Sequence, residues 1–164
     1  MPANGIGSAI STIVGQNIGA GQQERADKAY HYALRMGALF LLFFGLILSR
    51  RFISQAMVTF FSTDERVIPL ATDFLSLMAF WCWSNAFYNV TQGLFQGSGH
   101  TMITMIVDAS RIWIFRLLTL WVCANMLNMG VESVWYAVVI SNGTSAAILF
   151  ALYWTCLWKK STIK

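Results

Sequence analysis

Long apolar runs alternate with short polar and charged stretches along this 164-residue chain. A membrane-spanning helix needs about 20 predominantly apolar residues, and charges collect in the connections between spans. Cutting the sequence at its charged and Gly/Pro-rich stretches leaves five candidate spans. They are residues 2–18, 30–48, 67–95, 103–127 and 134–158. The pattern predicts an all-α membrane protein, a bundle of five transmembrane helices.

Composition supports this fold class. Hydrophobic residues make up 57% of the chain and charged residues 11%, whereas soluble domains carry about 25% charged residues to face water. So much apolar surface has to meet lipid, and the bilayer is the expected partner. Although the net charge is +4, the basic residues lie between apolar runs and form no patch with exposed aromatics, so nucleic acid is not an expected partner.

The first predicted helix is poor in large apolar side chains. Small residues recur at every third or fourth position, at Gly5, Ser8, Thr12, Gly15 and Gly19. This spacing places them on one helix face. Such a face lets the backbone of a neighbouring helix approach closely, so we expect this stripe to be a packing surface.

Cysteine and histidine give no sign of a metal or cofactor site. Cys82, Cys123 and Cys156 lie inside apolar runs without a C-x-x-C pair, and His31 and His100 lie in polar connections without ligands at suitable spacing. We therefore predict no catalytic residue, no metal site and no cofactor.

Three glycine-containing motifs are more specific than hydropathy. Residues 15–21 read G-Q-N-I-G-A-G, residues 93–101 read G-L-F-Q-G-S-G-H-T, and residues 130–137 read G-V-E-S-V-W-Y-A. In order and spacing they resemble motifs of the multidrug and toxic compound extrusion (MATE) transporters. The resemblance extends along the whole chain.

That resemblance implies a twelve-helix transporter of two six-helix lobes, which exports organic cations in exchange for Na⁺ or H⁺. Residues 1–164 would then be a partial C-terminal lobe. The expected partners are the N-terminal lobe, the first helix of this lobe and small organic cations. We expect the chain alone to be inactive, because alternating access needs two bodies that move against each other.

The resemblance implies a multi-pass protein of the cell inner (plasma) membrane, and the positive charges predict its orientation. Lys and Arg are enriched in cytoplasmic connections. With five spans, eight basic residues fall on one side and three on the other. The larger group is Arg25, Lys28, Arg35, Arg111, Arg116, Lys159, Lys160 and Lys164. We therefore expect the C-terminus to be cytoplasmic.

Polar residues recur at helical spacing in the third predicted helix, where Asn85, Tyr88, Asn89 and Gln92 share one face that Gln96 extends. One hypothesis is that they line the cleft and offer hydrogen bonds and an aromatic face to an organic cation. The other is that they are hydrogen-bonding contacts between helices, and the sequence leaves both open.

Two further positions are weaker candidates. Gln16 lies at a helix end, where it either contacts substrate or, as we favour, caps the glycine-rich turn. Asp108 and Arg111 are three residues apart and are expected to pair locally.

One branch of the family carries a coupling carboxylate at the position matching Asn85. An amide releases no proton, so a coupling acid is expected from the other lobe.

Other function classes are less well supported. A lipid-linked oligosaccharide flippase is related but calls for a more cationic cleft. A membrane-embedded enzyme requires clustered nucleophile or acid-base motifs in the spans, and the sequence has none. A non-transporting membrane scaffold stays an alternative. We therefore expect a transporter and not an enzyme.

Overall fold

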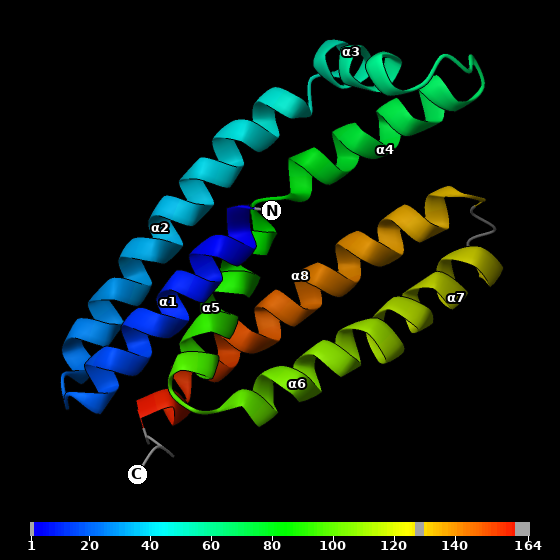
Figure 1. Cartoon of the computed structure of the whole chain (residues 1–164). Coiled ribbons are helices and arrows are strands. Elements are labelled where there is room, and N and C mark those ends of the chain that lie inside the picture. The colour runs from blue at the N-terminus through cyan, green and yellow to red at the C-terminus, as the bar shows by residue number, and fades with distance from the viewer. Residues whose placement is uncertain (1, 127–129, 160–164) are drawn as a thin grey trace.

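The computed structural model describes residues 2–126 and 130–159 (Figure 1). These residues form helices and connecting turns, with no strand among them, as predicted. The elements are α1 (Pro2–Gly19), α2 (Gln23–Leu48), α3 (Arg51–Phe61), α4 (Val67–Trp81), α5 (Ser84–Gly97), α6 (Thr101–Ser110), the π-helical η1 (Arg111–Arg116), α7 (Leu117–Asn125), α8 (Glu132–Trp154) and the short 3₁₀ helix η2 (Leu157–Lys159).

Helices α1 and α5 lie side by side in the middle of the bundle. Helix α2 covers both of them on one side, and α8 packs against α5 and against the continuous α6–η1–α7 rod on the other. Every predicted span thus contains helix. Position 127, the predicted end of the fourth span, lies outside the described residues.

In the described part of the chain, fewer helices than the five predicted spans are long and apolar enough to cross a membrane. Among the described helices, α2 and α8 are long and apolar enough to cross a membrane, and α4 with α5 adds a third if the bent pair is one span. Helix α1 is too rich in small and polar side chains to pass this test. The fourth predicted span is divided by η1 into pieces that are each short.

The predicted span over residues 67–95 is not one continuous helix. Helices α4 and α5 meet at an angle of 51°. At the break, the backbone N–H of Cys82 bonds to Ala79 and that of Asn85 bonds to Cys82, three residues back instead of four. The Ser84 hydroxyl also donates to the Trp81 carbonyl at 2.9 Å, a side-chain bond that competes with the helical ladder.

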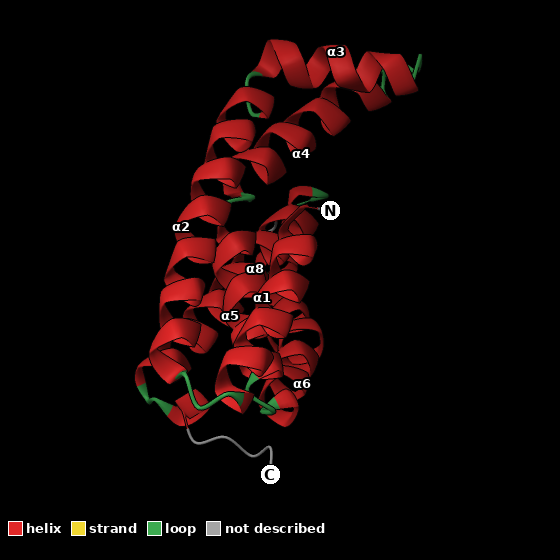
Figure 2. Ribbon diagram, turned by 60° about the vertical axis from the view of Figure 1, so that its left-hand side comes forward, coloured by secondary structure: helices red, strands yellow, loops and turns green. Residues whose placement is uncertain are grey.

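Helix α3 occupies a stretch for which the sequence analysis predicted no helix. It lies across the end of α2 and packs on α4 (Figure 2). Phe52 and Phe60 stand away from α4 and are 85% and 83% exposed, while Arg51 forms an ion pair with Asp73 at 3.6 Å. An amphipathic helix of this kind lies flat at a membrane surface.

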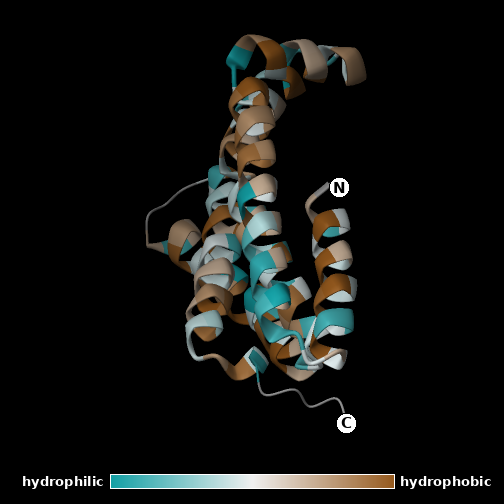
Figure 3. Ribbon diagram, turned by 90° about the vertical axis from the view of Figure 1, so that its left-hand side faces the viewer, coloured by the Kyte–Doolittle hydropathy of each residue, from teal (hydrophilic) through white to brown (hydrophobic). Residues whose placement is uncertain are grey.

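Hydropathy changes along α2. Its first half is hydrophilic and its second half hydrophobic (Figure 3), in line with the sequence, which places Glu24, Arg25, Asp27 and Lys28 in the early turns. The helix therefore begins seven residues before the predicted residue 30. The charged turns continue the helix beyond the apolar part, as is usual where a span leaves the bilayer.

The small-residue packing surface on α1 exists, but it coincides with the predicted stripe only at Gly15, whose added Cβ would lie 3.3 Å from the Gly97 carbonyl oxygen. A Cβ added to Gly7 would lie 2.6 Å from the Asn89 carbonyl oxygen, and a Cβ on Gly93 would overlap the Gly7 carbonyl. In contrast, Gly5 and Gly19 have nothing within 4 Å. Small residues occur on both sides of α1, and the face that packs is the one that also carries the larger buried side chains.

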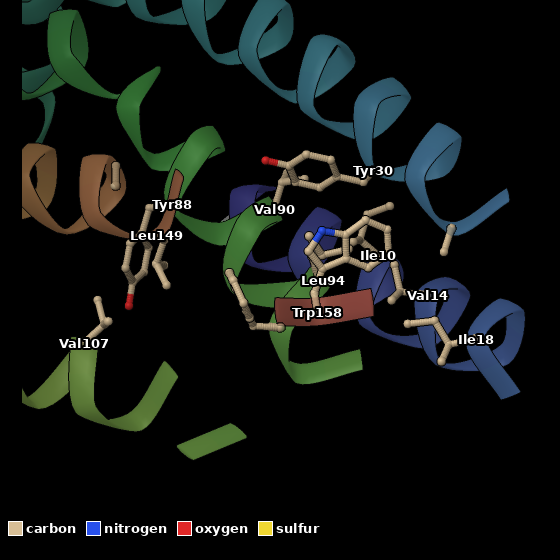
Figure 4. Close-up of a cluster of buried hydrophobic side chains, with 13 residues drawn as sticks. Ile10, Val14, Ile18, Tyr30, Tyr88, Val90, Leu94, Val107, Leu149 and Trp158 are labelled. Carbon is tan, nitrogen blue, oxygen red and sulfur yellow. The ribbon is translucent and has the colours of Figure 1, made fainter. Parts of the chain in front are cut away.

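Those larger side chains form the core. Ile10, Val14 and Ile18 of α1 meet Leu94 of α5 and Trp158 of η2 (Figure 4). Val14, Leu94 and Trp158 are fully buried. The apolar side chains and the small residues together press α1 onto α5.

Two of the sequence motifs end helices in the same way. After α1, the N–H groups of Gly21 and Gln22 bond to Ile18 and Asn17, and after α5 those of Gly99 and His100 bond to Gln96 and Phe95. Gly21 and Gly99 have positive φ, +73° and +87°. This is the Schellman arrangement, in which glycine adopts the left-handed conformation at little steric cost. The second of these turns directs the chain from α5 into α6.

Candidate functional site

A polar cavity of about 540 Å³ opens between α1, α5 and α6, and it contains four of the five predicted site residues. Its lining combines small residues of α1, the polar stripe of α5, a charged pair and side chains from α2 and the α4–α5 break. The lining residues are Ala3, Asn4, Gly7, Ser8, Leu41, Cys82, Asn85, Tyr88, Asn89, Gln92, Gly93, Gln96, Asp108 and Arg111.

Helix α5 faces the cavity with one side and the core with the other. Ala86, Val90 and Leu94 are buried in the protein, whereas Asn85 and Gln92 line the cavity. The helical period produces this separation, because residues three, four and seven apart share a face. The polar stripe predicted from spacing is therefore a continuous cavity wall.

A carboxylate that sequence reasoning left out of the site organises this wall. The Tyr88 hydroxyl donates a hydrogen bond to Asp108, and Gln92 Nε2 donates to Asp108 Oδ2 at 2.6 Å. Figure 4 shows the Tyr88 hydroxyl directed toward α6, the helix of Val107. Tyr88 and Gln92 thus make the hydrogen bonds between helices that one of the two hypotheses expected, and their contact with a substrate stays a prediction.

Arg111 completes the cluster. Its Nη2 lies 3.3 Å from Asp108 Oδ1, which confirms the expected local pair. In addition, its guanidinium carbon lies 4.5 Å from the centre of the Tyr88 ring, a cation–π distance. Ionisable side chains inside a spanning segment are functional-site candidates by default, so their position in the fourth predicted span was the signal that could have added both residues to the site.

The arginines of η1 connect this cluster to α8. Arg116 Nε donates to Ser141 Oγ at 3.3 Å, and Arg111 Nη1 and Arg116 Nη2 each lie 3.5 Å from Asn142 Oδ1. Hydrogen bonding between residues five apart, as in a π-helix, brings these two arginines onto nearly the same side. Ser141 and Asn142 of α8 are therefore the partner groups of these arginines.

The remaining predicted residues lie in less connected positions. Asn89 Nδ2 donates to the Asn85 carbonyl at 2.7 Å, a bond within α5. Gln16 is exposed and lies outside the cavity. The end of its helix is closed by backbone groups, because the N–H groups of Gly21 and Gln22 donate to the carbonyls of Ile18 and Asn17. A role of Gln16 in substrate contact stays a prediction.

The cavity lining carries charged, aromatic and amide groups. Within residues 2–126 and 130–159, no three or more His, Cys, Asp or Glu side chains gather where they could hold a metal ion. What the site offers is one carboxylate, one aromatic ring and several amides. Such groups bind and orient an organic cation through charge, ring face and hydrogen bonds.

An all-helical membrane protein with a charged, polar cavity between its helices has the architecture of a membrane transporter. The MatE family model matches residues 1–122. This chain belongs to the MatE family of multidrug efflux transporters. Because MatE proteins are transporters, membership in this family indicates that the chain is not an enzyme.

Curated relatives match over nearly the whole chain. A protein of Thermotoga maritima, "Probable multidrug resistance protein NorM", is 22% identical over 163 residues, covering 99% of this chain and 35% of its own length. "Protein DETOXIFICATION 9" of Arabidopsis thaliana is 26% identical and covers 98% of this chain and 33% of its own length. "Multidrug and toxin extrusion protein 1" of Pongo abelii is 24% identical, with 96% and 27% covered. The chain thus spans about a third of the length of these relatives.

Proposed function

We propose that the protein is part of a secondary active antiporter that exports organic cations in exchange for Na⁺ or H⁺. The observation that carries this proposal is the Asp108 carboxylate, held by Tyr88 and Gln92 beside an aromatic face in a cavity of about 540 Å³. A carboxylate in an environment of low dielectric attracts cations much more strongly than one in water. The names of the relatives, which include multidrug resistance proteins, agree with such a substrate class.

The charge of the cavity favours an organic cation over a lipid-linked oligosaccharide. An oligosaccharide carrier with phosphate groups calls for unbalanced positive charge. Here the positive charge of Arg111 is paired with Asp108 at 3.3 Å. The remaining wall is made of amides and one tyrosine ring, which suit uncharged or cationic aromatic groups.

Asp108 is also our candidate for the coupling group. The family resemblance at Asn85 implied that a coupling acid has to come from the other lobe. Asp108 supplies a carboxylate from this chain, one that keeps 34% of its side chain exposed. Such a group either takes up a proton or binds Na⁺ through its oxygens. Exchange of that ion against the organic cation would couple export to the gradient.

A second body is needed for export. We propose that the N-terminal lobe and the first helix of this lobe complete the cleft against α1. Gly5, Ser8 and Thr12 present small and hydroxyl groups on an exposed face of that helix, which suits close approach by further helices. The chain spans about a third of its relatives' length, so two-lobed transport needs more than residues 1–164.

The transport test uses cells that lack their own efflux pumps. The chain is expressed alone and joined to a NorM-type N-terminal portion, and ethidium accumulation is followed under imposed Na⁺ or pH gradients. We expect reduced accumulation for the joined chain and loss of that effect in Asp108→Asn. Asp73→Asn removes the same charge from the exposed ion pair with Arg51 and should leave export unchanged. Equal accumulation with and without the protein would remove the export proposal.

We also propose a plasma-membrane location with a cytoplasmic C-terminus. Gln23 Nε2 donates to the Lys159 carbonyl at 3.1 Å, so the charged start of α2 and the end of α8 lie at the same end of the bundle. Lys160 and Lys164, which strengthen this positive group, lie outside the described residues. A C-terminal fusion to green fluorescent protein should fluoresce, and one to alkaline phosphatase should be inactive. The reverse pattern would place this end outside.

A further inference from the structure

Arg111 stands in the cavity where an organic cation is expected to bind. Its guanidinium lies over the Tyr88 ring at 4.5 Å and against Asp108 at 3.3 Å. An aromatic face combined with a carboxylate is the pair of groups that recognises a bulky organic cation. Here the Tyr88 ring and the Asp108 carboxylate are both occupied by Arg111, a side chain of the protein itself.

The Tyr88 ring has little surface left for a ligand. Tyr88 is only 4% exposed, although it belongs to the cavity wall. Arg111 covers the ring face, while its own side chain is 22% exposed. A ligand can stack on this ring only after the guanidinium has moved.

Arg111 is held incompletely. Its guanidinium carries five N–H donors, yet Nε is buried without a hydrogen-bond partner among the described residues, and Nη1 reaches Asn142 Oδ1 at a marginal 3.5 Å. Asp108, by contrast, accepts hydrogen bonds from Tyr88 and Gln92 independently of Arg111. Departure of the guanidinium would therefore leave Asp108 oriented.

Helix α8 offers the guanidinium a further acceptor. Asn142 Oδ1 lies 3.5 Å from Arg111 Nη1 and 3.5 Å from Arg116 Nη2, while Ser141 Oγ accepts from Arg116 Nε at 3.3 Å. A small rotation of the Arg111 side chain toward α8 would shorten its contact with Asn142 and uncover Tyr88. The π-helical backbone of η1 supports both arginines near these acceptors.

We propose that Arg111 is a tethered competitor of the transported cation. It neutralises Asp108 and covers the Tyr88 ring when no substrate is bound, and a planar organic cation displaces it toward Asn142. Because an unpaired carboxylate inside a membrane is costly, an internal cation keeps the empty site stable. The inference rests on the proposed function only for the class of ligand.

The test measures binding without transport. The purified chain in nanodiscs of zwitterionic lipid is titrated into ethidium, and fluorescence anisotropy gives Kd. Removing the tethered cation in Arg111→Gln should tighten binding about tenfold, equivalent to about 1.4 kcal/mol. Arg111→Lys retains a tethered charge and should stay within about threefold of the unmodified chain.

Matched controls separate charge from position. Arg35→Gln removes the same charge from the exposed surface of α2, outside the cavity lining, and should leave Kd unchanged. Asp108→Asn should lose most of the cation affinity.

Each remaining outcome decides the proposal. Equal or weaker ethidium binding by Arg111→Gln would overturn it and make Arg111 a positioning residue for Asp108. Should Arg111→Gln not fold, Arg111→Met replaces it, and if neither variant folds, Arg111 is structural and the proposal fails. The assay uses no ion gradient, so it can be carried out on a chain that does not export. A failure of the Arg111 proposal would also leave the export proposal intact, because export does not require that Arg111 competes with the substrate.

Discussion

Substituting Gly7 by alanine tests the close contact between helices α1 and α5. The new Cβ would lie 2.6 Å from the carbonyl oxygen of Asn89, while ordinary contact begins at 3.4 Å. Helices α1 and α5 would have to separate by about 0.8 Å, the difference between these values. The partner atom belongs to the backbone and cannot rotate away, so the whole interface has to move.

The magnitude follows from two opposing effects. Overpacking of a well-packed interface costs about 1–3 kcal/mol, and alanine in a helix is more favourable than glycine by about 0.5–1 kcal/mol. The net expectation for Gly7→Ala is a loss of about 1 kcal/mol, and at most about 2.5 kcal/mol, of the free energy of unfolding. Gly5→Ala lies on the same helix with nothing within 4 Å of its Cβ, so only the favourable effect applies there.

The assay compares thermal unfolding of the two variants in one detergent, followed by circular dichroism. The midpoint should fall for Gly7→Ala and stay equal or rise slightly for Gly5→Ala. Gly97→Ala, whose Cβ would overlap the Ser11 carbonyl, should behave like Gly7→Ala. The reasoning is refuted if Gly7→Ala unfolds at the same temperature as Gly5→Ala, because the interface would then tolerate a methyl group.

Three further substitutions probe other parts of the fold. Tyr30→Phe removes a buried hydrogen bond of 3.0 Å to Thr91, so thermal unfolding should show a loss of about 1 kcal/mol. Trp158→Ala empties a fully buried site, and chemical denaturation should show a loss of about 3–5 kcal/mol. Phe60→Trp replaces an exposed side chain of α3. Its fluorescence should be quenched by lipids brominated near the headgroup, and an unquenched emission typical of water would contradict a surface position of this helix.

The polar wall of the cavity could be predicted from spacing alone. Asn85, Tyr88 and Gln92 occupy one face of any helix that contains them, since the helical period is a local property. The bend between α4 and α5 does not disturb this relation, because all three residues lie after it. What spacing leaves open is the partner of each side chain, and Tyr88 and Gln92 turn out to bond to Asp108.

The packing face of α1 shows the opposite case. Both sides of this helix carry small residues, so a stripe of glycine and serine predicted close packing without identifying the correct side. Gly7 packs against Asn89, whereas Gly5 meets open space. Which face of α1 packs depends on which of its apolar side chains fit the surface of α5, and Val14 on that face is fully buried.

Apolar run length, composition and turn motifs are properties of consecutive residues, so the membrane environment, the helical fold and the family could be predicted from the chain. The spacing of three residues also predicted the pair of Asp108 and Arg111. The contact of this pair with Tyr88 could not be predicted in the same way, since it depends on the relative register of α5 and α6. The Gly99 turn and the contacts that seat α1 and α8 on α5 set this register, and they join residues far apart in the chain.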